Sequence, residues 1–166
     1  MKTLSKVFKG IFFFCSFFTF SESYACTRVV YQGLNNIVLT ARSMDWRDDI
    51  SANLWAFPRG IQRSGEVGSS SIKWKSKYGS VITSSWDIVS SDGMNEMGLA
   101  GNLLWLAESN YKKKKKNKNT PGLSVSLWLQ YVLDNFATVQ AAVDELSKEK
   151  FVVVSSNIPG TDKFAT

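Results

Sequence analysis

Cys26 lies where a signal peptidase would leave it as the first residue of a mature chain, and the sequence contains no histidine. A cysteine thiol becomes a nucleophile when a base takes its proton, and in most cysteine hydrolases that base is an imidazole. The composition therefore excludes a Cys-His mechanism. A freed N-terminal amine is an alternative base, because its unperturbed pKa of about 7.7–8.0 lies near neutral pH.

Arg42 and Asp45 follow Cys26 at a spacing that suits a β-hairpin. The second strand of a hairpin returns beside the first, so both residues can lie near the N-terminal end. Arg42 can favour a thiolate through its positive charge, and Asp45 can accept a hydrogen bond from the α-amine. Strict alternation would put the two side chains on opposite faces, so a bend at Ser43-Met44 is needed. The alternative is an ordinary surface pair near a strand end.

Residues 1–25 predict a secretory signal peptide. They combine a lysine-containing start, an apolar run over residues 11–20 and small residues at Ser23 and Ala25. The run is shorter than the roughly 20 residues of a membrane-spanning helix, which argues against a signal anchor. We therefore expect a periplasmic or secreted protein, without stable membrane insertion after cleavage.

A lipoprotein signal is a second interpretation, because a cysteine directly follows the expected cleavage site. Cys26 would then carry a lipid, its amine would be blocked, and the chain would be a surface-binding protein. Such signals generally have an aliphatic residue three positions before the cysteine and a small residue two positions before it. Ser23 and Tyr24 fit this pattern poorly.

The composition indicates one compact domain over residues 26–166. A hydrophobic content of 44% and an aromatic content of 13% suit a globular core. Cys15 belongs to the signal, so the mature chain has Cys26 alone and no internal disulfide. One cysteine without histidine cannot build a zinc site, and no glycine-rich phosphate loop is present, so we expect no metal and no cofactor.

The net charge of +6 is concentrated partly in one lysine run, Lys112 to Lys118. Like charges repel one another, which predicts a solvated loop. A surface for an anionic partner is the alternative. Because the chain is expected to be exported and no aromatic residues interleave the lysines, we expect no nucleic-acid partner. The sequence leaves the oligomeric state open, with a homo-oligomer as one alternative.

Short alternating segments predict strands over much of the mature chain. A hairpin is expected from residues 27–32 and 37–46, with turn residues between them. Further strands are expected at residues 53–57, 72–78 and 81–85. Turn signals at Asp92-Gly93 and Gly98 follow, and then an apolar, buried segment over residues 99–106.

The hydrophobic period becomes helical after the lysine run. A first helix is expected to begin at Pro121-Gly122. Its apolar face would consist of Leu123, Leu127, Val132 and Leu133.

Thr138 is a candidate N-cap for a second helix that continues through Lys150. Its apolar side would consist of Val139, Val143 and Leu146. Residues 151–155 then predict a buried strand. This order of elements indicates an α+β fold with an antiparallel sheet.

Three segments of the chain resemble the choloylglycine hydrolase family. They are Cys26-Thr27, residues 41–46 (ARSMDW) and residues 92–99 (DGMNEMGL). The family includes penicillin V acylases and bile salt hydrolases, which are N-terminal-nucleophile (Ntn) hydrolases. These enzymes cleave linear carbon-nitrogen amide bonds through an acyl-thioester. The resemblance implies an αββα four-layer sandwich of antiparallel sheets, and a small-molecule N-acyl amide as substrate.

The resemblance also implies roles for four residues. Cys26 would be the nucleophile with its own α-amine as base, and Arg42 and Asp45 would hold and tune it. The position of the family's oxyanion contributor falls on Trp105. A backbone N–H can serve there whatever the side chain, although an ordinary core aromatic is the alternative. Four aromatic residues suit an aryl or long acyl group or, alternatively, a core: Trp46, Trp55, Phe57 and Trp105.

The chain also departs from the family. Full-length members are much longer, and two further active-site residues of the family, an asparagine and an arginine, lie beyond the part that residues 26–166 match. We therefore expect a truncated form of the sandwich, the N-terminal portion of the domain, with exposed sheet edges and an uncovered apolar face. A catalytically inactive remnant is the corresponding alternative.

Overall fold

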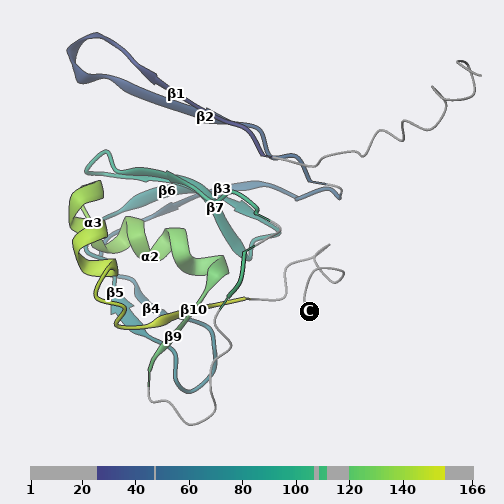
Figure 1. Ribbon diagram of the computed structural model, residues 1–166, viewed down its shortest axis with the longest axis vertical. Helices are drawn as coiled ribbons and strands as arrows, with labels where there is room; N and C mark the ends of the chain where they lie inside the picture. Colours follow the sequence, from purple (N-terminus) through teal and green to yellow (C-terminus); the bar gives the residue numbers. More distant parts are fainter. Residues whose placement is uncertain (1–25, 47, 107–108, 112–119, 156–166) are drawn as a thin grey trace, which may run out of the picture.

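The computed structural model describes residues 26–46, 48–106, 109–111 and 120–155, in which sheets pack around two helices (Figure 1). The expected signal peptide and the lysine run both lie outside these residues. The central element is a four-stranded antiparallel sheet with the order β3-β6-β7-β8. Its strands are β3 (Asn53–Phe57), β6 (Ser80–Ser85), β7 (Val89–Asn95) and β8 (Ala100–Asn102).

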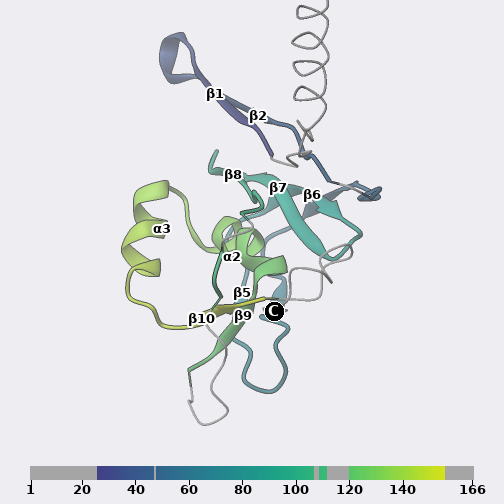
Figure 2. The same cartoon turned by 45° about the vertical axis from the view of Figure 1, so that its right-hand side comes forward.

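The predicted N-terminal hairpin is confirmed. Strands β1 (Arg28–Gln32) and β2 (Val38–Arg42) pair antiparallel, and a short 3-10 turn, η1 (Leu34–Asn36), joins them. The hairpin lies over the four-stranded sheet and extends past it in two views 45° apart (Figures 1 and 2). All five residues of β1 are exposed. The expectation of an uncovered apolar surface is therefore met here.

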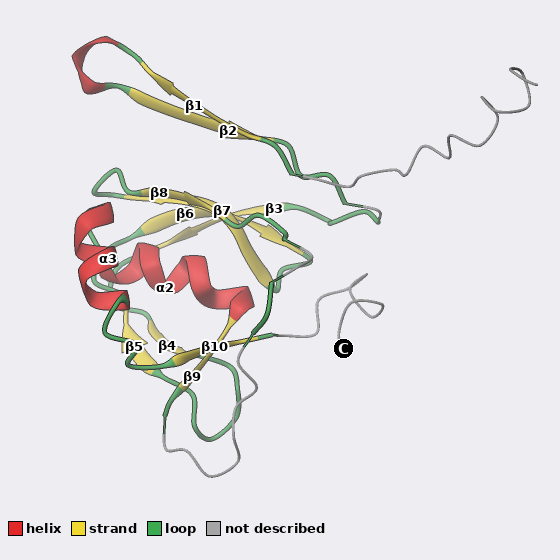
Figure 3. Cartoon of the chain, in the orientation of Figure 1, coloured by secondary structure: helices red, strands yellow, loops and turns green. Residues whose placement is uncertain are grey.

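Helices cover the other face of the four-stranded sheet (Figure 3). They are α2 (Trp128–Asn135) and α3 (Val139–Leu146), preceded by a 3-10 turn, η2 (Val125–Leu127). One apolar core lies between sheet and helices, and consists of Ile82, Leu99, Leu129, Leu133, Phe136 and Ala142. Neither described helix is long and apolar enough to cross a membrane. Helices, sheet and hairpin thus form successive layers of the expected α+β sandwich.

The expected turn at Asp92-Gly93 is wrong, because both residues lie inside β7. A Cβ on Gly93 would come within 2.8 Å of Leu133 Cδ1, so this glycine is needed for the close approach of α2. The turn before β7 is formed instead by Trp86 and Asp87, with φ angles of 52° and 53°. The turn predicted at Gly98 is confirmed, and its φ of +83° lies in the left-handed region.

The segment after the lysine run begins differently from the prediction. Gly122–Ser124 forms strand β9, which pairs parallel with β10 (Val152–Val154). The Gly122 N–H donates to Ser70 O, and its carbonyl accepts from the Ile72 N–H. The backbone groups of this segment are therefore committed to neighbouring strands, and α2 begins only at Trp128.

The N-cap prediction for the second helix is confirmed, because Thr138 Oγ1 accepts from the Ala141 N–H at 3.2 Å. The helix ends at Leu146, before Lys150. Its predicted apolar side is wrong in part, since Val139 and Val143 are 67% and 54% exposed. Ala142 faces the core instead.

The segment predicted as a strand at residues 72–78 is shorter in the structure. β5 (Lys73–Lys75) pairs antiparallel with β4 (Gln62–Ser64), and Trp74 is buried between two exposed lysines, as its alternation predicts. The segment at 99–106 is buried only at its start. Leu99 lies in the core, whereas Leu104 and Leu106 are 39% and 61% exposed after the chain leaves β8.

Candidate active site

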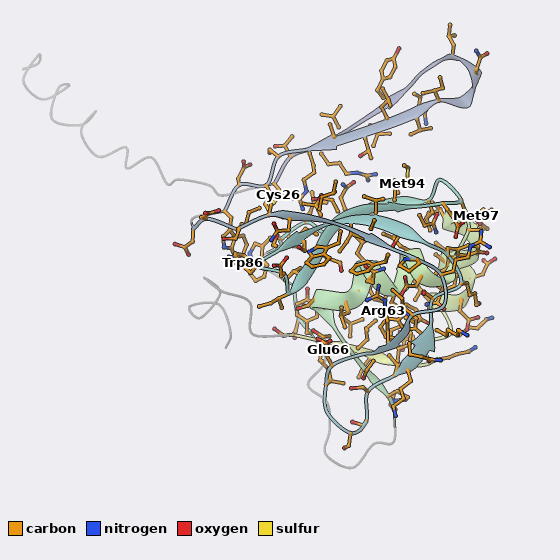
Figure 4. The ribbon with its side chains drawn as sticks, turned by 180° about the vertical axis from the view of Figure 1, so that it is seen from behind. Cys26, Arg63, Glu66, Trp86, Met94 and Met97 are labelled. Carbon is orange, nitrogen blue, oxygen red and sulfur yellow. The ribbon has the colours of Figure 1, made fainter. Side chains whose placement is uncertain are left out.

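Cys26 lies at the base of the hairpin, immediately before β1. Its side chain is half-buried and forms no disulfide. Figure 4 places it above the four-stranded sheet, toward Trp86 and away from Met97. The register pairs Arg28 with Arg42, so the end of β2 returns beside the start of β1. The hairpin thereby brings Arg42 to the Cys26 end of the chain, as the spacing predicts.

The predicted bend after Arg42 is present, because β2 ends there and residues 43–46 leave the strand. Ser43 is the residue that organises it. Its N–H donates to Thr27 O at 2.9 Å, and its Oγ accepts from the Thr27 N–H at 3.3 Å. The same hydroxyl donates to Asp45 Oδ2 at 3.1 Å. Ser43 therefore connects the first residue after Cys26 to the carboxylate of Asp45.

Sequence reasoning did not assign a role to Ser43. The signal was available in the expected bend, since a small hydroxyl residue at a bend commonly bonds to nearby backbone groups. No hydrogen bond or ion pair joins Cys26 to Arg42 or Asp45 among the described residues. The structure thus gathers these residues at one end of the hairpin without placing them in direct polar contact.

The Arg42 side chain is buried, with only 6% of it exposed. Its Nε lies 3.0 Å from Asp92 Oδ1, an ion pair in which the N–H is not aligned as a hydrogen bond. Its Nη2 donates to the carbonyl oxygen of Leu103. Its Nη1 is buried and has no hydrogen-bond partner among the described residues. A buried guanidinium whose Nη1 has neither a hydrogen bond nor an ion pair among the described residues is able to serve a further acceptor.

Trp46 and Trp105 come together beside this bend. Their ring centroids lie 5.5 Å apart in an edge-to-face contact, and the Trp86 ring also contacts Trp46, with a centroid distance of 5.9 Å. Trp105 is half-buried on the segment that follows β8. Trp55 and Phe57 form a separate stacked pair on β3. The aromatic residues suggested for acyl recognition therefore form two groups, and the Trp46 group is the one next to the bend.

The segment DGMNEMGL acts largely as a structural connector in this chain. Asp92 contacts Arg42, Gly93 admits α2, and Gly98 forms the following turn. The Asn95 side chain donates to the carbonyls of Leu133 and Phe136 at the end of α2, at 2.9 Å and 2.7 Å. Its Oδ1 also accepts from two N–H groups of the turn. This motif thus joins the hairpin, the sheet and the helix.

Comparison with known proteins places this arrangement in context. A sequence model of the linear amide C-N hydrolases of the choloylglycine hydrolase family matches residues 26–164. The chain is 53% identical over 151 residues to penicillin V acylase from Pectobacterium atrosepticum. That match covers 87% of this chain and 40% of the relative, so the chain spans less than half of the relative's length.

Solved structures agree. The structure of penicillin V acylase from Agrobacterium tumefaciens superposes with a TM-score of 0.73 at 59% identity, over 76% of this chain and 39% of that one. A mutant conjugated bile acid hydrolase from Clostridium perfringens gives a TM-score of 0.58 at 23% identity, over 82% of this chain and 42% of the other, which indicates a shared fold. This chain thus corresponds to less than half of the length of each matched structure.

Proposed function

Because the chain belongs to the choloylglycine hydrolase family of linear amide C-N hydrolases, we propose that it provides the nucleophilic end of an exported hydrolase of N-acyl amides. The observation that supports this most is the position of Cys26. It is the first residue of the family match, and the hairpin register brings Arg42 beside the same end of the chain. Removal of residues 1–25 would turn its backbone nitrogen into a free amine.

The proposed reaction has two steps. In the first, the α-amine of Cys26 takes the thiol proton, and the sulfur forms a bond with the amide carbonyl carbon. The carbon-nitrogen bond then breaks, and the leaving nitrogen receives the proton. In the second, water adds to the thioester, which releases the carboxylic acid and restores the thiol. No cofactor is needed for this balance.

The neighbouring residues would support these steps in different ways. Arg42 supplies a fixed positive charge that favours the thiolate, and its Nη1 has no described partner. Asp45 would orient the α-amine, and Ser43 fixes the position of Asp45 relative to the Thr27 backbone. A backbone N–H near Trp105 is the proposed oxyanion donor.

An aryl-substituted acyl group is the proposed substrate feature. The edge-to-face pair of Trp46 and Trp105 lies beside the bend that follows Arg42, and aromatic rings pack well against such pairs. Two relatives are penicillin V acylases. Penicillin V, whose acyl group is phenoxyacetyl, is therefore the first substrate to test.

Intact mass after export, followed by incubation with penicillin V, tests the proposal. We expect a mature chain that begins at Cys26 and gains a phenoxyacetyl group, which Cys26→Ala lacks. A matched variant that retains one extra residue before Cys26 keeps the thiol but has no free amine beside it, and should not acylate. A lipid increment on Cys26 would favour the lipoprotein alternative. A correctly processed chain that is never acylated would favour the inactive alternative.

A further inference from the structure

Among the described residues, the polar contacts of the Arg42 side chain come from the four-stranded sheet and the segment after it, and not from its own hairpin. Asp92 lies in β7, and Leu103 follows β8. The Arg42 side chain thus reaches from the hairpin to the four-stranded sheet. Because only 6% of the side chain is exposed, water cannot readily replace these contacts. The orientation of Arg42 therefore depends on the carboxylate opposite it.

Asp92 is itself held by a cross-strand neighbour. The β7-β8 register pairs Asp92 with Asn102, and the Asn102 Nδ2 donates to Asp92 Oδ1 at 2.7 Å. Asn102 Oδ1 in turn accepts from Thr40 Oγ1 at 3.3 Å. Thr40 lies two residues before Arg42 on the same face of β2. These three contacts link Arg42, Asp92, Asn102 and Thr40 in a row, and the β2 backbone between Thr40 and Arg42 closes the circuit.

This circuit leaves one side of the guanidinium available. Nε forms an ion pair with Asp92 without an aligned hydrogen bond, and Nη2 donates to Leu103 O. Nη1 has no hydrogen-bond partner in the part of the chain that the structure describes. An arginine fixed by two of its nitrogens presents the third in a defined direction, because the guanidinium is planar. The ion pair with Asp92 therefore helps to fix the direction in which Nη1 can reach a further acceptor.

We infer that Asp92, oriented by Asn102, is a positioning residue that holds Arg42 for its action on the Cys26 thiolate. The inference rests on the proposed function for the purpose of the Arg42 charge. Asp92 has no role in the proposed bond-making steps and acts through Arg42 alone. Its carboxylate is the partner without which the buried guanidinium would lose its fixed orientation.

The pH dependence of Cys26 alkylation distinguishes this role from a direct effect of charge. Loss of a nearby negative charge would by itself favour the thiolate and lower the pH midpoint of alkylation. Loss of Arg42 positioning would do the opposite. We therefore expect Asp92→Asn in the mature chain to raise the midpoint for iodoacetamide by about one pH unit, as for the loss of a nearby opposite charge.

Three variants complete the experiment. Asn102→Ala keeps the Asp92 charge but removes the hydrogen bond that Asn102 donates to it. This variant should raise the midpoint by less than Asp92→Asn does. Asp92→Asn should add nothing in an Arg42→Gln background, because its effect passes through Arg42. Thr83→Val is the matched control, since Thr83 is half-buried and pairs with Asp92 from β6, and should leave the midpoint unchanged.

An unchanged or lowered midpoint in Asp92→Asn overturns the inference, as does a rise that persists when Arg42 is absent. Far-ultraviolet circular dichroism identifies a variant that has failed to fold, in which case Asn102→Ala decides the question. Acylation by penicillin V is measured in parallel. A shifted midpoint without any acylation would contradict the proposed function only, whereas normal acylation with an unshifted midpoint would contradict the inference only.

Discussion

Gly93 of β7 lies against Leu133 of α2 so closely that a Cβ at this glycine would come within 2.8 Å of the leucine Cδ1. The same Cβ would meet Val81 O and Ile82 Cγ2 at 2.8 Å. The Val81 oxygen belongs to the adjacent strand β6 and cannot move aside easily, so a side chain at residue 93 would disturb the sheet as well as the contact with α2. This contact sets the distance between the sheet and its helical layer.

Gly93→Ala should therefore destabilise the fold by about 1–3 kcal/mol, the usual cost of overpacking. Gly98→Ala is the matched control. Nothing lies within 4 Å of its Cβ position, but its φ of +83° imposes strain of about 1 kcal/mol. Urea unfolding of the two variants should rank Gly93→Ala as the less stable. Equal stability would mean that β7 and α2 can move apart freely.

The buried carboxylate of Asp134 should make stability decline as the pH rises. It accepts from Trp74 Nε1 at 2.7 Å and from Gln130 Nε2 at 2.8 Å, and it pairs with Arg63 Nε at 2.9 Å. The effect of burial nevertheless outweighs the opposing effects of these contacts, so the pKa of Asp134 is raised above its ordinary value. Because the pKa is raised in the folded state, the unfolded chain releases this proton at a lower pH than the folded chain does.

The contribution of Asp134 to the stability of the fold is thus greatest below the unfolded carboxyl pKa of about 4. It is lost as the pH rises through the raised pKa of the folded state. Exposed carboxylates with lowered pKa values, such as Glu96 at about 2, change stability in the opposite direction. Comparison with Asp134→Asn isolates the effect. Urea unfolding at several pH values should show the wild-type stability falling relative to the variant as the pH increases, and a constant difference would refute this assignment.

In the proposed reaction, Ser43→Ala should slow acylation of Cys26 by penicillin V by about tenfold, on the scale of one lost hydrogen bond of about 1.4 kcal/mol. The hydroxyl accepts from the Thr27 N–H and donates to Asp45, so its loss frees both the first peptide and the carboxylate. Single-turnover mass spectrometry measures the rate. Ser64→Ala at an exposed position of β4 is the control, and an equal rate in all three proteins would remove Ser43 from the site.

Thr138→Ala should destabilise the protein by about 1 kcal/mol through loss of the N-cap of α3. Thr138→Ser retains an oxygen for the Ala141 N–H and should cost much less. Thermal unfolding of both variants provides the comparison. A Ser variant as unstable as the Ala variant would indicate that the methyl group, and not the cap, is what matters.

The outer face of the hairpin should make the isolated mature chain prone to self-association. Val29 pairs with Ala41 and Tyr31 with Leu39 on this face, and Tyr31 and Leu39 are 62% and 59% exposed. Contiguous apolar surface on an unpaired strand edge favours aggregation. Leu39→Lys should lower light scattering at a given concentration, with Lys75→Arg on β5 as a control that preserves charge. Unchanged scattering in Leu39→Lys would exclude this face.

The hairpin and the neighbourhood of Arg42 were predictable because both depend on residues that are close in sequence. Alternation and turn residues define the two strands, and their return fixes Arg42 near the Cys26 end. The family resemblance added the expected sandwich, which the described layers and the solved relatives confirm. The contact of Arg42 with Asp92 depends on the packing of one sheet on another, which no local pattern specifies.

Other features were hidden for the same reason. β9 exists because Val152–Val154 pairs with it from beyond two helices. The turn at Trp86-Asp87 has left-handed backbone angles without glycine, and most of the side-chain hydrogen bonds that hold it involve residues far away in the sequence. Trp86 Nε1 donates to Asp49 O, and Asp87 accepts from Asn53, Trp55 and Ser84. The predicted Asp92-Gly93 turn failed because the glycine serves a contact with α2.

The hairpin is fastened to the sheet at Thr40 and Arg42, whereas Leu34 at its tip is 87% exposed. The end of the hairpin that carries Cys26 is therefore anchored to the sheet, while its tip projects into solvent (Figure 1).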